Sequence, residues 1–207
     1  MAQLQDLIGS IIIGGVILLM LLVFNGNIME SAGIQTFKTT VQGNLTAVTD
    51  IVENDFRKMG YRVAFPQDSA IVTAESTKIV FQGDIDNNGS VDLFQYTTDT
   101  VGVIKTPNPR DIAVRRKVTG PATPQDARMV LGITKFKLQY YDALDSLIKE
   151  SPVLLPSKIR SIKITIAIEN KEHLLDKRKG QRMSNVFQDT TYAAAYWERT
   201  IKPKNVR

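Results

Sequence analysis

The sequence has no cysteine and only one histidine, His173, among its 207 residues. Without cysteine the chain cannot form a disulfide framework, a Cys-based zinc site or a thiol nucleophile. A single histidine excludes a multi-histidine metal centre within one chain, and we interpret His173 as a surface residue. No nucleophile elbow, Gly-rich phosphate loop or His-Glu metal motif is present. We therefore expect a protein that is not an enzyme and has no small-molecule substrate.

Positive charge is concentrated towards the C-terminus. The last 37 residues carry nine Lys and Arg against four Asp and Glu, a balance of +5 that equals the formal charge of the whole chain. No zinc-finger or helix-turn-helix pattern accompanies them, and no basic helix with interleaved aromatic residues does. We therefore expect no nucleic-acid partner, and we interpret residues 171–191 as a basic, solvated loop.

A long hydrophobic run lies near the N-terminus. Residues 7–24, LIGSIIIGGVILLMLLVF, contain no charge and are just long enough to cross a bilayer as a helix. A cleaved signal peptide is the alternative, but the preceding residues lack Lys and Arg and the following residues make a poor cleavage site. The run therefore predicts an uncleaved membrane anchor over residues 1–27, with the lipid bilayer as a partner.

The flanks of this run suggest a topology, and the first residues of the run, together with Asp6, suggest a contact face. The short N-terminal flank favours an N-in orientation with the C-terminal bulk outside the cytoplasm. Asp6 stands at the edge of the span, where it is either an interfacial charge or a carboxylate that needs a cationic partner. Ser10 and Gly14 are small residues four apart, a spacing that lets helices approach closely. Asp6, Ser10 and Gly14 are thus candidate assembly residues.

An amphipathic helical pattern follows the anchor. From residue 34 to residue 59 the apolar positions recur at gaps of three or four, with polar residues between them. They are Ile34, Phe37, Val41, Leu45, Val48, Val52, Phe56 and Met59. We expect residues 28–60 to continue the helix, with a bend or a melted turn around Asn25–Asn27. The stripe is either the face that packs on a soluble domain, which we favour, or a coiled-coil seam.

The remaining residues, 61–207, read as a strand-rich soluble domain. The expected strands, separated by turns that hold most of the prolines, are 70–74, 78–82, 91–97, 112–118, 129–141 and 159–169. Residues 192–201 are expected to form a last strand or a short helix. The fold class is therefore α+β: a long N-terminal helix, membrane-spanning and then amphipathic, packed on a mostly antiparallel β-sheet.

One loop carries a pattern typical of calcium binding. Asp84, Asp86, Asn88 and Asp92, with Ser90 between the last two, place oxygen-bearing side chains at alternate positions around Gly89. The pattern departs from the helical calcium loop, because its twelfth position is Gln rather than Glu and its flanks are strand-like. It predicts either a plain β-hairpin with Asn-Gly in the turn or a calcium site on these four residues. No cofactor is expected other than this calcium.

The chain resembles type IV pilins and type II secretion pseudopilins, in particular minor pilins of the W type and pseudopilins of the J type. Asp50–Tyr61 (DIVENDFRKMGY) is similar to the end of the family's long helix. Ile79–Asp84 and Asp92–Tyr96 are similar to its first hairpin. Ile133–Asp142 and Leu155–Ile164 are similar to its later strand pair.

The N-terminus departs from the family. The family has a short basic leader ending in Gly, followed by a Phe-Thr-Leu-Ile-Glu run, and neither has a counterpart in the first residues here. Removal of Met1 alone would make Asp6 the fifth residue, the position of the family's glutamate. A cut after Gly9 would instead place Gly14 there.

The resemblance implies a non-enzymatic structural subunit of a type II secretion or type IV pilus-like envelope machine. Such a subunit would be anchored once in the bacterial inner membrane, with a periplasmic domain and with sibling pilin-like or pseudopilin subunits as partners. The alternative is a bitopic membrane-anchored binding module of an envelope complex, calcium-binding in one version, that does not polymerise.

Overall fold

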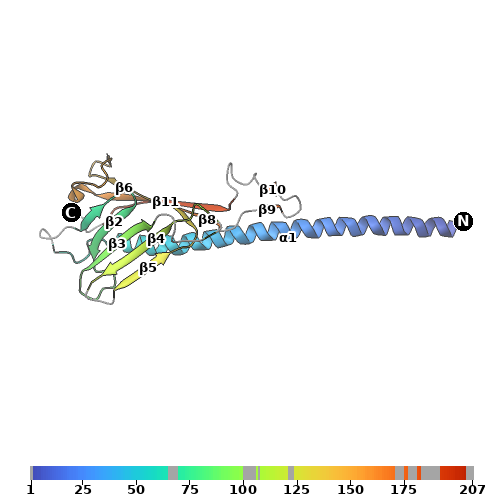
Figure 1. The fold of residues 1–207 in the computed structure, drawn as a ribbon, viewed down its shortest axis with the longest axis horizontal. Helices are drawn as coiled ribbons and strands as arrows, with labels where there is room; N and C mark the ends of the chain where they lie inside the picture. Colours follow the sequence, from blue (N-terminus) through green and yellow to red (C-terminus); the bar gives the residue numbers. More distant parts are fainter. Residues whose placement is uncertain are drawn as a thin grey trace.

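The computed structural model describes residues 2–64, 70–99, 106, 108–120, 124–170, 175–176, 181–182 and 192–203. A single helix, α1 (Ala2–Arg57), is followed by antiparallel strands, which confirms the predicted α+β class. Figure 1 shows the first half of α1 extending alone from the N-terminus and its second half lying along the sheets. The first half of α1 is therefore a free apolar rod. The second half of α1 and the strands that follow form the folded part of the protein, which we call the head.

The helix is continuous through Asn25-Gly26-Asn27, so the bend or melted turn expected there is wrong. Gly and Asn each cost a helix only about 0.7–1 kcal/mol relative to Ala. Strong helix-forming segments on both sides offset that cost, because each added residue gains a hydrogen bond once a helix exists. The anchor and the amphipathic segment are therefore one element.

The apolar stripe is core, as predicted, although α1 ends at Arg57 rather than residue 60, so the last member, Met59, lies in the turn after the helix. Val41, Val48, Val52, Phe56 and Met59 are buried, and the other three members, Ile34, Phe37 and Leu45, are partly buried against the same hydrophobic cluster. The face that the periodicity singled out thus lies against the sheets, which is the alternative favoured over a free coiled-coil seam.

The head contains two main sheets. The first has the order β1-β2-β3-β4-β5, and the second has the order β11-β8-β6-β7. The strands of the first are β1 (Ile71–Ala74), β2 (Lys78–Gly83), β3 (Asp92–Asp99), β4 (Ala113–Thr119) and β5 (Gln125–Met129). Those of the second are β6 (Ile133–Tyr141), β7 (Leu147–Ile148), β8 (Ser161–Glu169) and β11 (Ala194–Ile201). A short 3-10 helix, η1 (Pro156–Lys158), precedes β8.

The single strand expected over residues 129–141 is not continuous: Met129 is the last residue of β5, and the strand β6, which belongs to the other sheet, begins at Ile133. The chain turns at Gly132, whose φ is +79°. A Cβ at this position would lie 2.2 Å from the carbonyl oxygen of Glu169, so the turn needs glycine for its conformation and for its space. Residues 129–131 are all apolar and run directly into the alternating residues after Gly132, which concealed this change of sheet.

The C-terminal expectations have mixed outcomes. Residues 192–201 include strand β11, which resolves the choice between a strand and a helix. Within 171–191 the structure describes only β9 (Leu175–Asp176) and β10 (Gln181–Arg182), which pair antiparallel. His173 and the rest of the expected basic loop lie outside the described residues.

An aromatic stack links the helix to both sheets. Phe56 of α1 lies 5.4 Å from Phe81 and 5.5 Å from Tyr96, measured between ring centroids, and Tyr96 stacks on Phe136 of β6 at 6.4 Å. Such ring pairs add to the free energy gained by burying their large apolar area. Because β2, β3 and β6 all contribute rings, the end of α1 is fixed between the two sheets.

Candidate functional site

The predicted assembly residues lie on the exposed part of α1. Asp6, Ser10 and Gly14 are spaced four apart within one helix and therefore share one face. The Ser10 hydroxyl donates a 2.8 Å hydrogen bond to the main-chain carbonyl of Asp6. A Cβ added at Gly14 would meet no atom within 4 Å. The face is open to a neighbouring helix.

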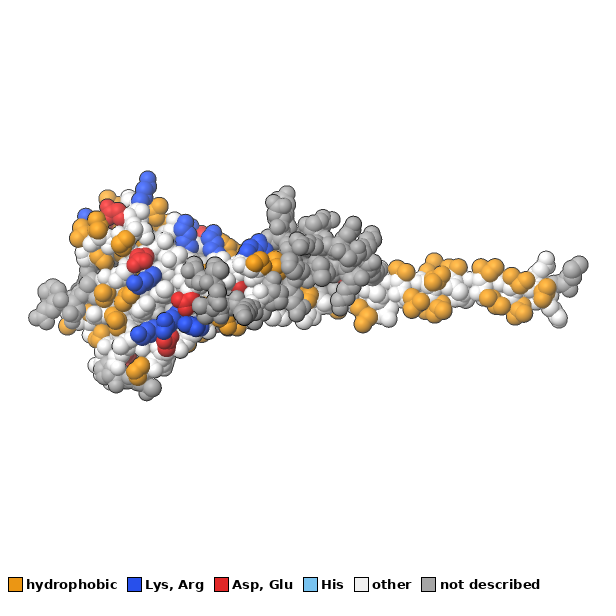
Figure 2. Space-filling model, in the orientation of Figure 1, with side chains coloured by type: hydrophobic (Ala, Val, Ile, Leu, Met, Phe, Trp, Pro, Cys, Tyr) orange, Lys and Arg blue, Asp and Glu red, His pale blue; other side chains and the backbone are white. Residues whose placement is uncertain are grey.

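The half of α1 that carries these residues is apolar and projects from the head. It holds an eighteen-residue window with a mean hydropathy of 2.9, none of which is buried. Figure 2 shows hydrophobic side chains along the whole free part of the helix. The helix is therefore long and apolar enough to cross a membrane, in agreement with a single-pass anchor.

The acidic loop between β2 and β3 is organised around Asp84, which is fully buried. Its carboxylate accepts hydrogen bonds from the main-chain N–H of Asn88 at 3.1 Å and of Gly89 at 3.0 Å, and from the Arg62 guanidinium at 2.7 Å. Burial raises the pKa of Asp84, but the Gly89 and Arg62 hydrogen bonds outweigh it and hold the pKa below its ordinary value. Asp84 is therefore ionised at neutral pH.

The next two predicted ligands are held by the same loop. Asp86 accepts hydrogen bonds from the main-chain N–H of Asn88 at 3.2 Å and from its side-chain amide at 2.8 Å. The Asn88 side-chain oxygen in turn accepts from the N–H of Ser90 at 2.8 Å. The structure thus brings Asp84, Asp86 and Asn88 together in one hydrogen-bonded turn, with Gly89 in the left-handed region at a φ of +93°.

Asp92 lies where this loop enters β3, and it is only 3% exposed. Its Oδ1 atom is buried and finds no hydrogen-bond donor in the described part of the chain. Burial raises the pKa of Asp92, and the nearby charges of Asp86 and Asp84 raise it further. Asp92 differs from Asp84 in this respect, because Asp84 has an ionic partner in Arg62, whereas no described residue forms an ion pair with Asp92.

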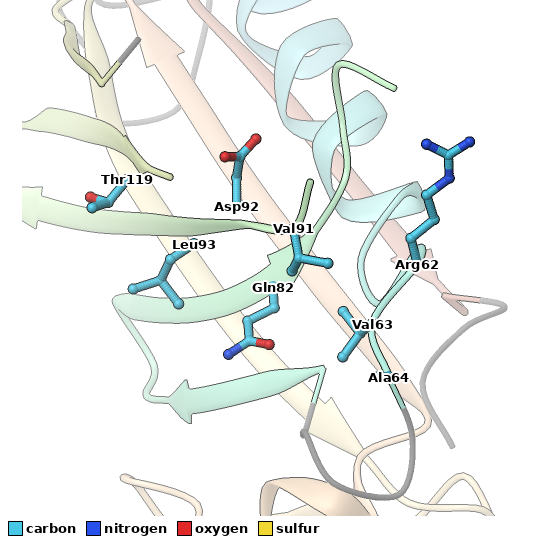
Figure 3. A pocket seen from close by; sticks show the side chains of 8 residues that line it. All are labelled: Arg62, Val63, Ala64, Gln82, Val91, Asp92, Leu93 and Thr119. Atoms are coloured by element: carbon cyan, nitrogen blue, oxygen red, sulfur yellow. The ribbon is translucent and has the colours of Figure 1, made fainter. Parts of the chain in front are cut away.

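An open pocket of about 300 Å³ adjoins the loop and is shown in Figure 3. Its lining includes Arg62, Val63, Gln82, Asp92 and Leu93. The side chains of Asp92 and Leu93 point to opposite sides of β3 in this view. Among the described residues, no three His, Cys, Asp or Glu side chains are placed to hold a metal ion as they stand.

A buried polar network that sequence reasoning missed joins α1 to the first sheet. Asp55 is 1% exposed, and its Oδ2 atom accepts from the Tyr96 hydroxyl at 2.5 Å and from Arg116 Nε at 2.6 Å. Burial raises the pKa of Tyr96 well above its ordinary value, and the Asp55 charge raises it further, so the phenol stays a neutral donor. The one signal for this network in the sequence was an acidic residue, Asp55, directly beside Phe56 of the apolar stripe.

Comparison with known proteins assigns no family to the chain. No family model matches the sequence, and no curated protein matches it significantly.

Proposed function

We propose that the chain is a non-enzymatic, membrane-anchored structural subunit, minor-pilin-like or pseudopilin-like, of a type II secretion or type IV pilus-like envelope machine. The observation that carries this proposal is the single helix α1, apolar and free in its first half and buried in the head in its second. A continuous helix fixed in this way couples the position of the head to that of the anchor. The proposed work is assembly by contact between subunits.

The free half of α1 supports side-by-side packing of subunits. In a bilayer, helices associate through close packing and polar contacts, because lipid tails are as apolar as the side chains themselves. Gly14 leaves space for a neighbouring backbone, and Asp6 offers an exposed carboxylate at the edge of the span. A sibling subunit with a cation at that depth would complete the contact.

The proposed location is the bacterial inner membrane, with the head in the periplasm. Protease added to spheroplasts should then digest the head while leaving a protected fragment that contains the apolar run of residues 7–24. Protection of the head in intact spheroplasts, with digestion only after lysis, would contradict the periplasmic placement and leave the anchor unaffected.

Asp6→Ala should lower co-purification of sibling subunits from detergent-solubilised membranes by about tenfold, which corresponds to losing roughly 1.4 kcal/mol of pairing free energy. The reason is that a carboxylate at the membrane edge is stabilised by a cationic partner. Asp6→Glu keeps the charge and should retain most of the association. The measurement is quantitative recovery of the siblings with each tagged variant.

The matched control is Gln5→Ala, which removes a neighbouring polar side chain at the same depth without changing the charge. Extraction at high pH should leave all variants in the membrane fraction. Equal recovery with wild type and Asp6→Ala would contradict the assembly role of Asp6. It would favour the alternative, a bitopic binding module that does not polymerise, for which the acidic loop of the head is the supporting observation.

A further inference from the structure

The loop between β2 and β3 holds more negative than positive charge. Asp84, Asp86 and Asp92 lie within or next to it, whereas two cations contact it. Arg62 pairs with Asp84, and Lys58 Nζ donates to the carbonyl oxygen of Ile85 at 2.6 Å. Among the described residues, the carboxylates of Asp86 and Asp92 are therefore left without an ion-pair partner, and of these two only Asp92 has a buried oxygen without a hydrogen-bond donor.

The burial of Asp92 points to a ligand. A buried carboxylate oxygen without a donor is costly, because the charged form loses its hydration and gains nothing in return. Asp92 Oδ1 packs over Gly120 of the adjacent chain segment, where a Cβ would lie only 1.7 Å from that oxygen. Glycine at position 120 therefore leaves room for the unpaired carboxylate of Asp92. A small apolar side chain at position 92 would avoid the free-energy cost of burying that carboxylate.

The other polar groups of the loop present oxygen atoms. N–H donors fix the Asp84, Asp86 and Asn88 side chains, and each oxygen that accepts one such bond keeps a second lone pair. Calcium takes six to eight oxygen ligands in flexible geometry. Counted from Asp84, the side chains stand at positions 1, 3, 5 and 9 of a calcium loop, with Gly89 at position 6.

We propose that Asp84, Asp86, Asn88 and Asp92 bind a divalent cation of the calcium class, and that the ion replaces Arg62 as the partner of Asp84. The Asp92 carboxylate, whose Oδ1 atom has no hydrogen-bond donor among the described residues, then coordinates the ion. Gln95 stands at position 12, where a Glu would add two carboxylate oxygens, and its amide donates instead to Thr97. The expected affinity is therefore weak, with a Kd on the order of 10⁻⁴–10⁻³ M, as in extracellular modules.

Arg62 can make this exchange. Its guanidinium lies 2.7 Å from Asp84 Oδ2, and its side chain is 45% exposed, so it can turn into solvent without uncovering the core. In the absence of the ion, Arg62 neutralises Asp84 alone.

The test is calcium titration of the full-length protein in detergent, by calorimetry and by melting temperature. At calcium about tenfold above its Kd, the wild-type head should melt roughly 3–6 °C higher than in EDTA, since the ion binds only the folded loop. Magnesium at the same concentration should give a smaller shift, because it demands a tighter octahedral site. Asp145→Asn, which removes an exposed acid from another turn, should respond like wild type.

Asp92→Asn separates an ion site from a plain hairpin. In EDTA the variant should melt at or above the wild-type temperature, because an uncharged amide replaces an unpaired buried charge. In calcium the order should reverse, and the apparent affinity should fall at least tenfold. A purely structural Asp92 would give the same order of melting temperatures in both conditions.

Arg62→Gln tests the exchange itself. Removing the competing guanidinium should raise the apparent calcium affinity severalfold, whereas equal affinity in Arg62→Gln and wild type would overturn the exchange. If 10 mM calcium produced neither heat nor a melting shift in wild type and in Arg62→Gln, the ion site would be overturned and the loop would be a hairpin alone. Neither result would bear on the Asp6 co-purification experiment.

Discussion

Val48→Asp should cost the head about 4 kcal/mol or more of its free energy of unfolding, a large part of the 5–15 kcal/mol typical of a domain. Val48 is fully buried on the face of α1 that packs on the sheets. The substitution would place an unpaired carboxylate in the hydrophobic core, where charged groups lose hydration without compensation. Leu45→Asp should have a smaller effect, because Leu45 is only partly buried.

The matched control is Ala47→Asp, which introduces the same charge one residue earlier on the exposed side of the helix. Its cost should stay below about 1 kcal/mol, mainly from the lower helix propensity of Asp. Trp197 is the single tryptophan and packs against the core, so its fluorescence reports unfolding of the head in denaturant. Similar midpoints for Val48→Asp and Ala47→Asp would show that the stripe is not core.

Arg116→Met should destabilise the head by about 3–5 kcal/mol, because among the described residues it leaves the buried Asp55 charge with the Tyr96 hydroxyl as its one partner. Burial alone would lower the pKa of Arg116, but its hydrogen bond to Asp55 and the charge of that carboxylate raise it instead. The pair thus connects α1 to the first sheet through two ionised groups that depend on each other.

The double variant Asp55→Asn/Arg116→Met should recover most of the loss. It removes both charges, and the Asn side-chain oxygen can still accept from Tyr96. Arg115→Met is the control on the same strand, since Arg115 pairs with Asp126 at the surface, and it should leave the denaturation midpoint almost unchanged. A double variant as unstable as Arg116→Met would mean that lost packing, and not an unpaired charge, explains the effect.

Local patterns predicted the elements better than their arrangement. The helix-period stripe ending at Met59 identified the buried face of α1, and the isoleucines at every second position from 162 to 168 lie in the core, although the residues between them are buried or partly buried too. The error at residues 129–141 arose because Met129, Val130 and Leu131 are all apolar and therefore read as the start of the next strand, whereas the chain turns at Gly132 beside the carbonyl of Glu169. The prediction at Asn25–Asn27 was wrong because the long helical segments on both sides offset the weak helix propensity of these three residues.

The candidate ion site also combines features that a local pattern predicts with features that depend on the tertiary arrangement. The spacing of Asp84, Asp86, Asn88 and Asp92 is visible in the sequence, and the structure gathers the first three in one turn. Nothing in the spacing indicated that Arg62 pairs with Asp84 or that Asp92 Oδ1 is buried without a donor. Both depend on where the end of α1 and strand β4 come to lie beside the loop.

By itself, the sequence determined what depends on neighbours a few residues apart: the apolar run of α1, its amphipathic continuation and the alternating strands. Periods of 3.6 and 2 residues encode which side chains share a face, and burial of that face follows from its apolar character. Only the tertiary structure decided which sheet each strand joins and which charges meet. Asp55 meets Arg116 across 61 residues, and Arg62 meets Asp84 across 22. Such pairs form because packing the two sheets on α1 brings distant segments together, which no local period records.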